Sequence, residues 1–187
     1  MIKKIEEQFE EHIELVKQNL GLIKKIDLAA AKIISCIEKG GKVLIAGNGG
    51  SAADSQHIAA ELIGRYEKER VALSAISLTT DTSILTAWSN DDCFENIFSR
   101  QIEGLGKKGD VFIGITTSGN SENIIRAVKK AKEKNMTTIV FLGKNGGKMK
   151  GLADVELLVV SNRTSRIQEI HMLCYHILCG LIEESFS

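Results

Sequence analysis

The sequence predicts an α/β fold: a doubly wound, five-stranded and mainly parallel sheet, flanked by helices and preceded by extra N-terminal helices. Two observations lead to this fold class. Five short apolar runs alternate with segments of helical periodicity, and the runs are continuously hydrophobic, as is typical of parallel strands that helices cover on both faces. Turns rich in glycine or in hydroxyl side chains follow two of the runs, and each turn opens a helix.

Helices occupy the first part of the chain. Apolar residues recur every three or four positions between charged ones over residues 3–25, which predicts a helix. A second helix is expected from about Leu28 to Glu38, ended by Gly40 and Gly41. A chain of 187 residues suits one domain, so we expect the N-terminal helices, about residues 1–40, to pack on the α/β core of a single domain, 1–187.

Strands and helices then alternate along the chain. The expected strands are Lys42–Ala46, Ala72–Leu78, Val111–Ile115, Thr137–Leu142 and Val155–Val160. Helices are expected up to Ile63, in segments from Thr82 to Leu105, up to about Lys134, and from Arg166 to Glu184. The charged run at residues 65–70 is expected to be a solvated loop between a helix and a strand.

Charge and hydropathy exclude several classes of protein. With 24 basic and 24 acidic side chains, the chain has no general electrostatic reason to bind nucleic acid or an anionic membrane. Its longest apolar stretches are far below the roughly 20 residues of a membrane-spanning helix. The first 17 residues lack the apolar centre of a signal peptide. We therefore expect a cytoplasmic protein that binds neither nucleic acid nor a membrane.

The four cysteines indicate structural roles. None of Cys36, Cys93, Cys174 and Cys179 has the CxxC spacing of a zinc knuckle or a redox motif. Three of them lie in otherwise apolar helical segments, where a reduced thiol behaves as a small hydrophobic side chain. We therefore expect free, mostly buried thiols.

Two turns at the carboxyl ends of predicted strands are candidate phosphate-binding loops. The first is Gly47-Asn48-Gly49-Gly50-Ser51, which offers backbone N–H groups and a helix N-terminus, and is neither a GxGxxG fingerprint nor a Walker A loop. The second adds hydroxyl groups, at Thr116, Thr117, Ser118 and Ser121, beside Gly119. Each turn alone could merely cap its helix. Two such turns at one edge of a sheet favour a phosphorylated small ligand.

Acid–base and metal-binding candidates lie on two of the predicted helices. His57 and Glu61 are four residues apart on the helix that the first loop opens, so they could share a metal, transfer a proton, or form a simple surface pair. On the last helix, Glu169 and His176 fall within roughly 20° of each other, while Gln168 and His176 are roughly 80° apart. Helix geometry therefore favours Glu169 as the partner of His176.

Other polar residues receive structural interpretations. His171 and His12 are expected to be packed or to face solvent. Asn90 and Asp91 follow a helical segment and could cap the next one or contact a ligand.

Five segments together resemble a known family: GNGGSAADSQHIAAEL, TDTSILTAWSNDDCFENIFSRQIE, GDVFIGITTSGNSENIIRAVKKAKEKNM, GKNGGKMKGLADVEL and SRIQEIHMLCYHILCGLIE. They are similar to the phosphoheptose isomerases, members of the sugar isomerase (SIS) domain superfamily, and the resemblance covers nearly the whole chain. The resemblance implies an SIS-type fold. It also implies isomerisation of sedoheptulose 7-phosphate to D-glycero-D-manno-heptose 7-phosphate through an enediol, for lipopolysaccharide or capsule precursors.

The resemblance further implies a homotetramer with sites shared between subunits and one Zn²⁺ per subunit. By motif matching, the zinc ligands would be His57, Glu61, Gln168 and His176, so that the family pattern selects Gln168 where helix geometry selects Glu169. Glu61 would move the carbon-bound proton, and His176 would assist proton transfer at oxygen. The substrate contacts would be Asn48, Gly49, Gly50, Ser51, Glu61, Asn90, Asp91, Thr116, Thr117, Ser118, Ser121 and Gln168.

Two residues depart from the family pattern, and other functions stay open. Thr116 stands where serine is common, which keeps the hydroxyl, and Cys93 stands where glycine is frequent. The leading alternative is a non-catalytic SIS-domain protein, either of the replication-initiator-binding type or a sugar-phosphate sensor. A second is an isomerase of a shorter phosphosugar. A third, a nucleotide-binding regulator, is disfavoured by the absence of a Walker A lysine and of GxGxxG.

Overall fold

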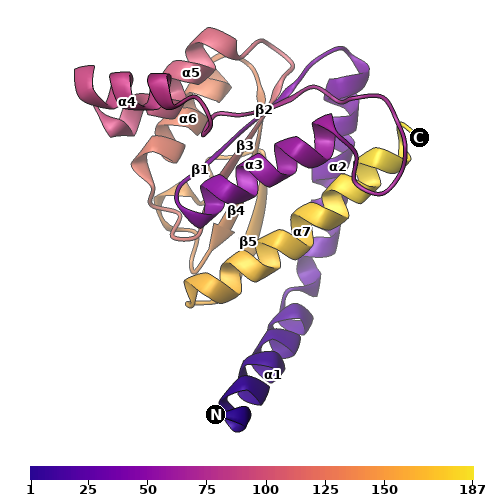
Figure 1. The fold of residues 1–187 in the computed structure, drawn as a ribbon. Coiled ribbons are helices and arrows are strands. Elements are labelled where there is room, and N and C mark those ends of the chain that lie inside the picture. The colour runs from indigo at the N-terminus through magenta and orange to yellow at the C-terminus, as the bar shows by residue number, and fades with distance from the viewer.

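A five-stranded parallel sheet in the order β2-β1-β3-β4-β5 forms the centre of the computed structural model, which describes residues 1–187 (Figure 1). The strands are β1 (Val43–Gly47), β2 (Ala75–Ser77), β3 (Val111–Thr116), β4 (Thr137–Gly143) and β5 (Val155–Val159). The predicted five-stranded, doubly wound fold is therefore confirmed. The strand predicted over Ala72–Leu78 is shorter than expected, because β2 is an edge strand that pairs only with β1 along three residues.

Seven helices accompany the sheet. They are α1 (Ile2–Gln18), α2 (Ile23–Glu38), α3 (Gly50–Ile63), α4 (Thr82–Asp91), α5 (Ile97–Leu105), α6 (Glu122–Glu133) and α7 (Thr164–Glu184), with short 3-10 turns at Leu20–Leu22, Phe94–Asn96 and Gly147–Met149. None of them is long and apolar enough to span a membrane.

The core has two sides because every strand residue of β1 and β3 is buried. Val43 and Ile45 of β1 face a cluster that includes residues of α2, α3 and α7. Leu44 and Ala46 face the opposite cluster, which α5 and α6 supply. This burial on both faces explains the continuously apolar runs of the sequence. It also places α3 and α7 on the same face of the sheet, where they lie side by side (Figure 1).

The N-terminal helices divide at a position that periodicity does not predict. The expected helix over residues 3–25 is wrong, because α1 ends at Gln18 and α2 begins at Ile23. Asn19 is the cause: its side-chain amide donates to the Leu15 carbonyl (2.9 Å), and its Oδ1 accepts the N–H of Val160 (3.0 Å). This side chain is only 7% exposed, so the chain turns where Asn19 is anchored to the end of β5.

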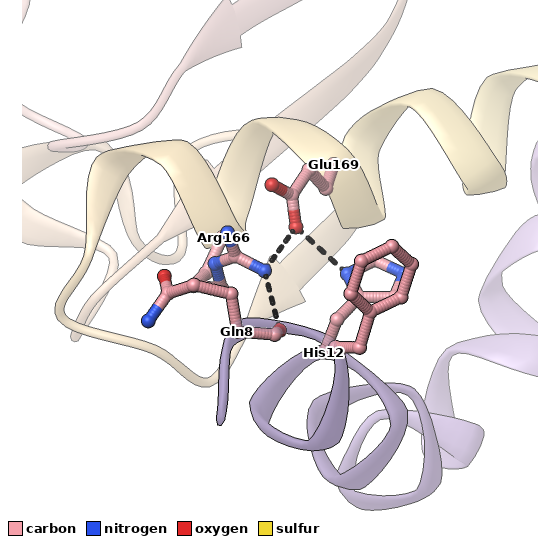
Figure 2. Close-up of a pocket in the computed structure, with 5 residues that line it drawn as sticks. Gln8, His12, Arg166 and Glu169 are labelled. Carbon is pink, nitrogen blue, oxygen red and sulfur yellow. Dashed lines mark hydrogen bonds and ion pairs between the residues drawn. The ribbon is translucent and has the colours of Figure 1, made fainter. Parts of the chain in front are cut away.

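α2 packs on the core along its length, whereas α1 reaches the core only near its end, at Leu15 and Val16. Leu15 is the one buried residue of α1, which extends beyond the rest of the molecule (Figure 1). Polar contacts attach α1 to the start of α7: His12 Nδ1 lies 2.7 Å from Glu169 Oε2, and Arg166 donates to the Gln8 carbonyl (Figure 2). A cavity of about 350 Å³ lies between these groups.

The charged run at residues 65–70 is a loop, as expected, but it is not wholly solvated. The side chain of Arg70 is 1% exposed, and its Nε lies 3.5 Å from Oε2 of Glu183, which is 2% exposed. A buried guanidinium requires such a partner, and α7 provides it from more than a hundred residues away. Sequence alone cannot show that partner.

The cysteines and His171 follow their structural interpretations. All four cysteines are free, and Cys36, Cys174 and Cys179 are buried in helices. His171 is fully buried in α7, and its Nε2–H donates to the Leu142 carbonyl (2.9 Å), while Nδ1 has no partner. Burial lowers the pKa of His171 to about 4 from an ordinary 6.5, although the hydrogen bond to Leu142 opposes this effect.

The buried His171 predicts acid-sensitive stability. Below about pH 6.5 the unfolded chain binds a proton at this imidazole, whereas the folded chain does not until about pH 4. The free energy of unfolding should therefore fall between these values as the pH is lowered, by up to about 3 kcal/mol from this group. Denaturant titrations of the wild type and of His171→Gln across pH 4–7 should show a smaller fall in the variant. Equal falls would contradict this assignment.

Candidate functional site

The two predicted phosphate loops meet at the point where the strand order reverses. One loop joins β1 to α3 and the other follows β3, and these strands are neighbours from which the chain winds in opposite directions. Ligands of doubly wound sheets bind in the crevice at such a point. The order of the strands therefore places both loops at the expected binding edge.

The first loop is tied to the helix that follows the second. The side-chain amides of Asn48 and Asn123 exchange two hydrogen bonds, of 3.0 and 2.8 Å. Gly49 has a positive φ of 56°, and Ser51 is 4% exposed at the start of α3. The turn therefore fixes its backbone N–H groups at the N-terminus of α3, where the helix dipole favours an anion.

Hydrogen bonds within the second loop arrange its hydroxyl groups. Thr116 Oγ1 lies 2.9 Å from Ser121 Oγ, and Ser118 Oγ accepts the N–H of Asn120 (3.1 Å). Thr117 lies half-buried between them. Gly119 has a φ of 66°, and a Cβ there would collide with the Gly146 carbonyl, so the loop packs closely against the segment after β4. Neutral hydroxyls and amides can hold an anion in this arrangement without a lysine.

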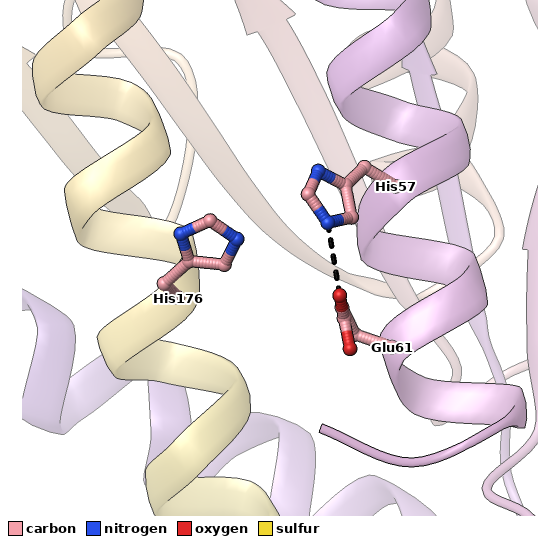
Figure 3. Close-up of side chains that lie close together, drawn as sticks. All are labelled: His57, Glu61 and His176. Atoms are coloured by element: carbon pink, nitrogen blue, oxygen red, sulfur yellow. Dashed lines mark hydrogen bonds and ion pairs between the residues drawn. The ribbon is translucent and has the colours of Figure 1, made fainter. Parts of the chain in front are cut away.

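Three of the predicted catalytic and metal-binding residues lie together. One ligand atom each of His57, Glu61 and His176 can be chosen so that all lie within 4.8 Å of one another (Figure 3). His57 Nε2 is 2.9 Å from Glu61 Oε1, and these side chains are 41% and 19% exposed. α3 supplies the first two residues and α7 the third (Figure 3). The side-by-side packing of these helices therefore creates the cluster.

Two residues that the sequence analysis did not select surround this cluster. The Tyr175 hydroxyl lies 3.1 Å from His57 Nδ1, and Asp54 is 8% exposed one turn before His57. Burial raises the pKa of the Asp54 carboxyl, although the Tyr175 hydroxyl and His57 favour its charged form. Their positions in the sequence could have indicated this. Asp54 lies three residues before His57, on the same face of the helix, and Tyr175 is the neighbour of His176. The Tyr175 hydroxyl thus lies beside one ring nitrogen of His57 and Glu61 beside the other.

The cluster has the donor types of a zinc site. Imidazole nitrogens and a carboxylate oxygen are ligands that Zn²⁺ takes in catalytic centres, which keep a further position open. His57, Glu61 and His176 thus fit this ion. The amide of the fourth predicted ligand, Gln168, lies against Gly50 at the start of α3, where a Cβ would collide with it. Gln168 is therefore next to the first phosphate loop.

Glu169 is not the partner of His176, contrary to the helix-wheel prediction. Its Oε2 lies 2.7 Å from His12 Nδ1 and 2.9 Å from the Arg166 guanidinium (Figure 2). The wheel shows which residues share a stripe, but successive turns of α7 meet different neighbours. The first turns contact α1, whereas the turn that carries His176 contacts α3.

The structure does not join Asn90 and Asp91 to the rest of the site. Both are exposed at the end of α4, and Asn90 donates to Asp91 (2.9 Å) without a hydrogen bond to any other predicted site residue. Cys93, at the neighbouring turn, lies 3.8 Å from the Arg126 guanidinium.

Comparisons with known proteins show which family the chain belongs to. The SIS domain family model matches residues 7–143. The chain is 53% identical over 186 residues to phosphoheptose isomerase 1 of Campylobacter jejuni, with both chains fully covered. The phosphoheptose isomerase of Neisseria gonorrhoeae superimposes with a TM-score of 0.91 at 43% identity, covering 97% of this chain and 98% of that one. The Francisella tularensis enzyme gives 0.94 at 40% identity, with 98% of each chain covered.

A pair of glycine substitutions tests the packing of the second loop. Gly119→Ala should lower the free energy of unfolding by about 1–3 kcal/mol, because its positive φ and the Gly146 carbonyl leave no place for a Cβ. Gly104→Ala, in α5 with open space around it, should raise the free energy by about 0.4–1 kcal/mol. Chemical denaturation of both variants gives the comparison. A Gly119→Ala protein as stable as the wild type would contradict the close packing of this loop.

Proposed function

The chain belongs to the SIS domain family and, within it, to the phosphoheptose isomerases, and on this basis we propose that it interconverts sedoheptulose 7-phosphate and D-glycero-D-manno-heptose 7-phosphate. It is an aldose–ketose isomerase of a sugar phosphate in heptose biosynthesis. The observation that carries the proposal is the cluster of His57 and Glu61, on the helix that the first phosphate loop opens, with His176 of α7. The heptose product would then supply lipopolysaccharide or capsule synthesis in the cytoplasm.

The loops would hold the substrate by its phosphate. The hydroxyl groups of Thr116, Ser118 and Ser121 and the N-terminus of α6 offer donors to phosphate oxygens, which suits an anion bound without a permanent positive charge. Asn48, Gly49, Gly50, Ser51 and Gln168 would contact the sugar at the neighbouring edge. This division leaves the reacting end of the sugar free to extend toward the cluster.

Glu61 is the proposed base for the carbon-bound proton. Conversion of the ketose removes a proton from C1, gives a cis-enediol and returns the proton to C2, so one carboxylate can serve both steps. Glu61 has one carboxylate oxygen engaged with His57, and its side chain is 19% exposed. The second oxygen makes no hydrogen bond to the protein, so it can face the substrate while the first lies among the proposed zinc ligands.

His176 is the proposed acid and base at oxygen. As the carbonyl moves from C2 to C1, a proton must reach O2 and another must leave O1, and an imidazole can perform both transfers. His57, held by Tyr175 and Glu61, orients the base instead. The two imidazoles thus have separate functions in this proposal.

A zinc ion is part of the proposal. The three clustered side chains would hold it, with Gln168 as the further ligand that the family pattern implies. Bound there, Zn²⁺ would act as a Lewis acid on the sugar oxygens. The support is the set of donor atoms within 4.8 Å of one another.

We also propose that the chain is a homotetramer with sites shared between subunits. The support is an apolar stripe on α1: Ile2, Ile5, Phe9 and Ile13 are 73%, 52%, 69% and 53% exposed at three- and four-residue intervals. An apolar helix face this exposed requires a partner, and a second copy of the same helix supplies a complementary one. The exposed positions of Asn90 and Asp91 would allow them to serve a neighbouring copy.

Turnover of sedoheptulose 7-phosphate tests the function. The purified protein should form the heptose 7-phosphate, lose activity after chelation and regain it with zinc. Glu61→Gln should lower kcat by at least about 100-fold, because removal of a positioned base costs roughly 10²–10⁴ in rate. Substrate binding by this variant, measured calorimetrically, should persist because the loops are unchanged.

Glu169→Gln is the matched control, since this carboxylate lies on α7 but contacts α1. Its turnover should stay near the wild-type value. Near-normal turnover of Glu61→Gln would contradict the role of the base. Full activity of protein shown to be metal-free would contradict the zinc proposal. Folded, zinc-loaded wild type that converts no heptose phosphate would favour a shorter phosphosugar or a binding role.

Assembly is tested by mass in solution. Sedimentation equilibrium should give four times the chain mass for the wild type, and Phe9→Glu should dissociate the assembly because it places a charge in the centre of the apolar stripe. Glu10→Gln, on the polar face of the same helix, should remain tetrameric. A monomeric wild type would contradict the proposal.

A further inference from the structure

The ring of Tyr66, which is not part of the His57, Glu61 and His176 cluster, stacks on the His176 imidazole. Tyr66 belongs to the loop after α3, and its ring stacks on the His176 imidazole, with centroids 5.8 Å apart and planes at 25°. The other two rings near His176, those of Tyr175 and His57, meet it edge-on at 65° and 78°. At Gly180, one turn further along α7, a Cβ would lie 3.4 Å from the Tyr66 ring. The ring therefore lies flat along this part of α7.

His176 lacks the means by which His57 is oriented. His57 has partners for both ring nitrogens, Glu61 at 2.9 Å and the Tyr175 hydroxyl at 3.1 Å. His176 makes no hydrogen bond to any protein group, and its rotamer is held by packing alone. A functional histidine normally has its second nitrogen fixed by a hydrogen bond. The stacked ring of Tyr66 supplies the missing constraint on the plane of this imidazole.

The loop that carries Tyr66 is anchored by a buried carboxylate. Glu183 of α7 accepts the backbone N–H groups of Tyr66, Glu67 and Lys68, each at 2.7 Å. Its side chain is 2% exposed, so these three bonds form away from solvent. Burial raises the pKa of Glu183, but the hydrogen bonds outweigh it and the pKa is lowered overall, which keeps the anchor charged.

Arg70 connects the same anchor to α3. Its guanidinium donates to the carbonyls of Glu61 (2.6 Å), Gly64 (3.2 Å) and Val71 (2.8 Å), and its Nε lies 3.5 Å from Glu183. The loop is thus fastened at one end to the backbone of the proposed base and at the other to the helix of His176. These contacts fix the position of Tyr66 along α7.

We infer that Tyr66 is a positioning residue for His176, and that Glu183 sets the position of Tyr66 through the loop backbone. This inference rests on the proposed function for its kinetic consequence, but the orientation of the imidazole can be measured without turnover. The ring itself is required, whereas the hydroxyl of Tyr66, which makes no hydrogen bond, is not.

Four variants separate positioning from packing. Tyr66→Leu removes the ring and keeps an apolar side chain on the core, whereas Tyr66→Phe keeps the ring. Phe186→Leu is the matched control, because Phe186 is also a half-buried aromatic packed against the same core but does not touch His176. Tyr66→Met provides a second ring-free variant if the leucine variant fails to fold.

The first readout is the NMR spectrum of the His176 ring protons in metal-free protein. Stacking shifts these signals through the ring current, so Tyr66→Leu should move them toward values for an unstacked imidazole, while Tyr66→Phe and Phe186→Leu should not. The second readout is zinc affinity by chelator competition, which should fall by about 10–100-fold in Tyr66→Leu alone. In steady-state kinetics, the same variant should lose a similar factor in kcat, with KM changed less than two-fold.

Unchanged His176 signals in the ring-free variant would overturn the inference, whatever the activity. Equal losses of zinc affinity and kcat in Tyr66→Leu and Phe186→Leu would also overturn it, since they would indicate general packing. A wild type without isomerase activity would contradict the proposed function instead, and the NMR comparison would still decide the position of Tyr66.

Discussion

The packing of α3 against α7 on one face of the sheet is the constraint on which the site depends. His57 and Glu61 come from one helix and His176 from the other, so a shift of either helix along its axis would separate them. Polar contacts fix this register at three levels. Gly50 admits the Gln168 amide at one end, Tyr175 reaches His57 in the middle, and Arg70 with Glu183 joins the helices at the far end. Buried apolar residues of both helices fill the space between them and the sheet.

The site separates its charged groups from its phosphate loops. The loops use backbone N–H groups, hydroxyls and helix N-termini, which are fixed by the turns themselves and do not change charge with pH. The titratable groups gather two turns along α3, and the carboxylate there is already paired with an imidazole. A phosphate held at the loops would therefore bind apart from the carboxylate that we propose as the base. This separation suits proton transfer on a substrate that carries its charge at the opposite end.

Much of the fold could be predicted from the sequence, because buried parallel strands leave continuous apolar runs and glycine-rich turns mark their carboxyl ends. The pair His57 and Glu61 was also accessible, since i,i+4 spacing places both on one helix face. What escaped prediction depends on long-range partners. Asn19 ends α1 because Val160 lies beside it, and Glu183 is buried because three backbone N–H groups face it. Val160 is far from Asn19 in sequence, and the loop at Tyr66 is far from Glu183, so the apolar periodicity cannot predict these contacts.

The two ends of α7 illustrate why the remaining assignments need a structure. Helix geometry placed Glu169 and His176 on one stripe, yet the first turns of α7 meet α1 and the later turns meet α3. Residues on one stripe of α7 therefore contact different helices. Glu169 contacts α1 and helps to attach it. That attachment is polar and peripheral, while the apolar side of α1 stays exposed. A helix held to its own chain mainly by polar contacts, with its apolar residues outward, supports the proposed contact between chains. The exposed Asn90 and Asp91 on α4 are consistent with the same arrangement, because a site shared between copies does not require one chain to bring all of its residues together.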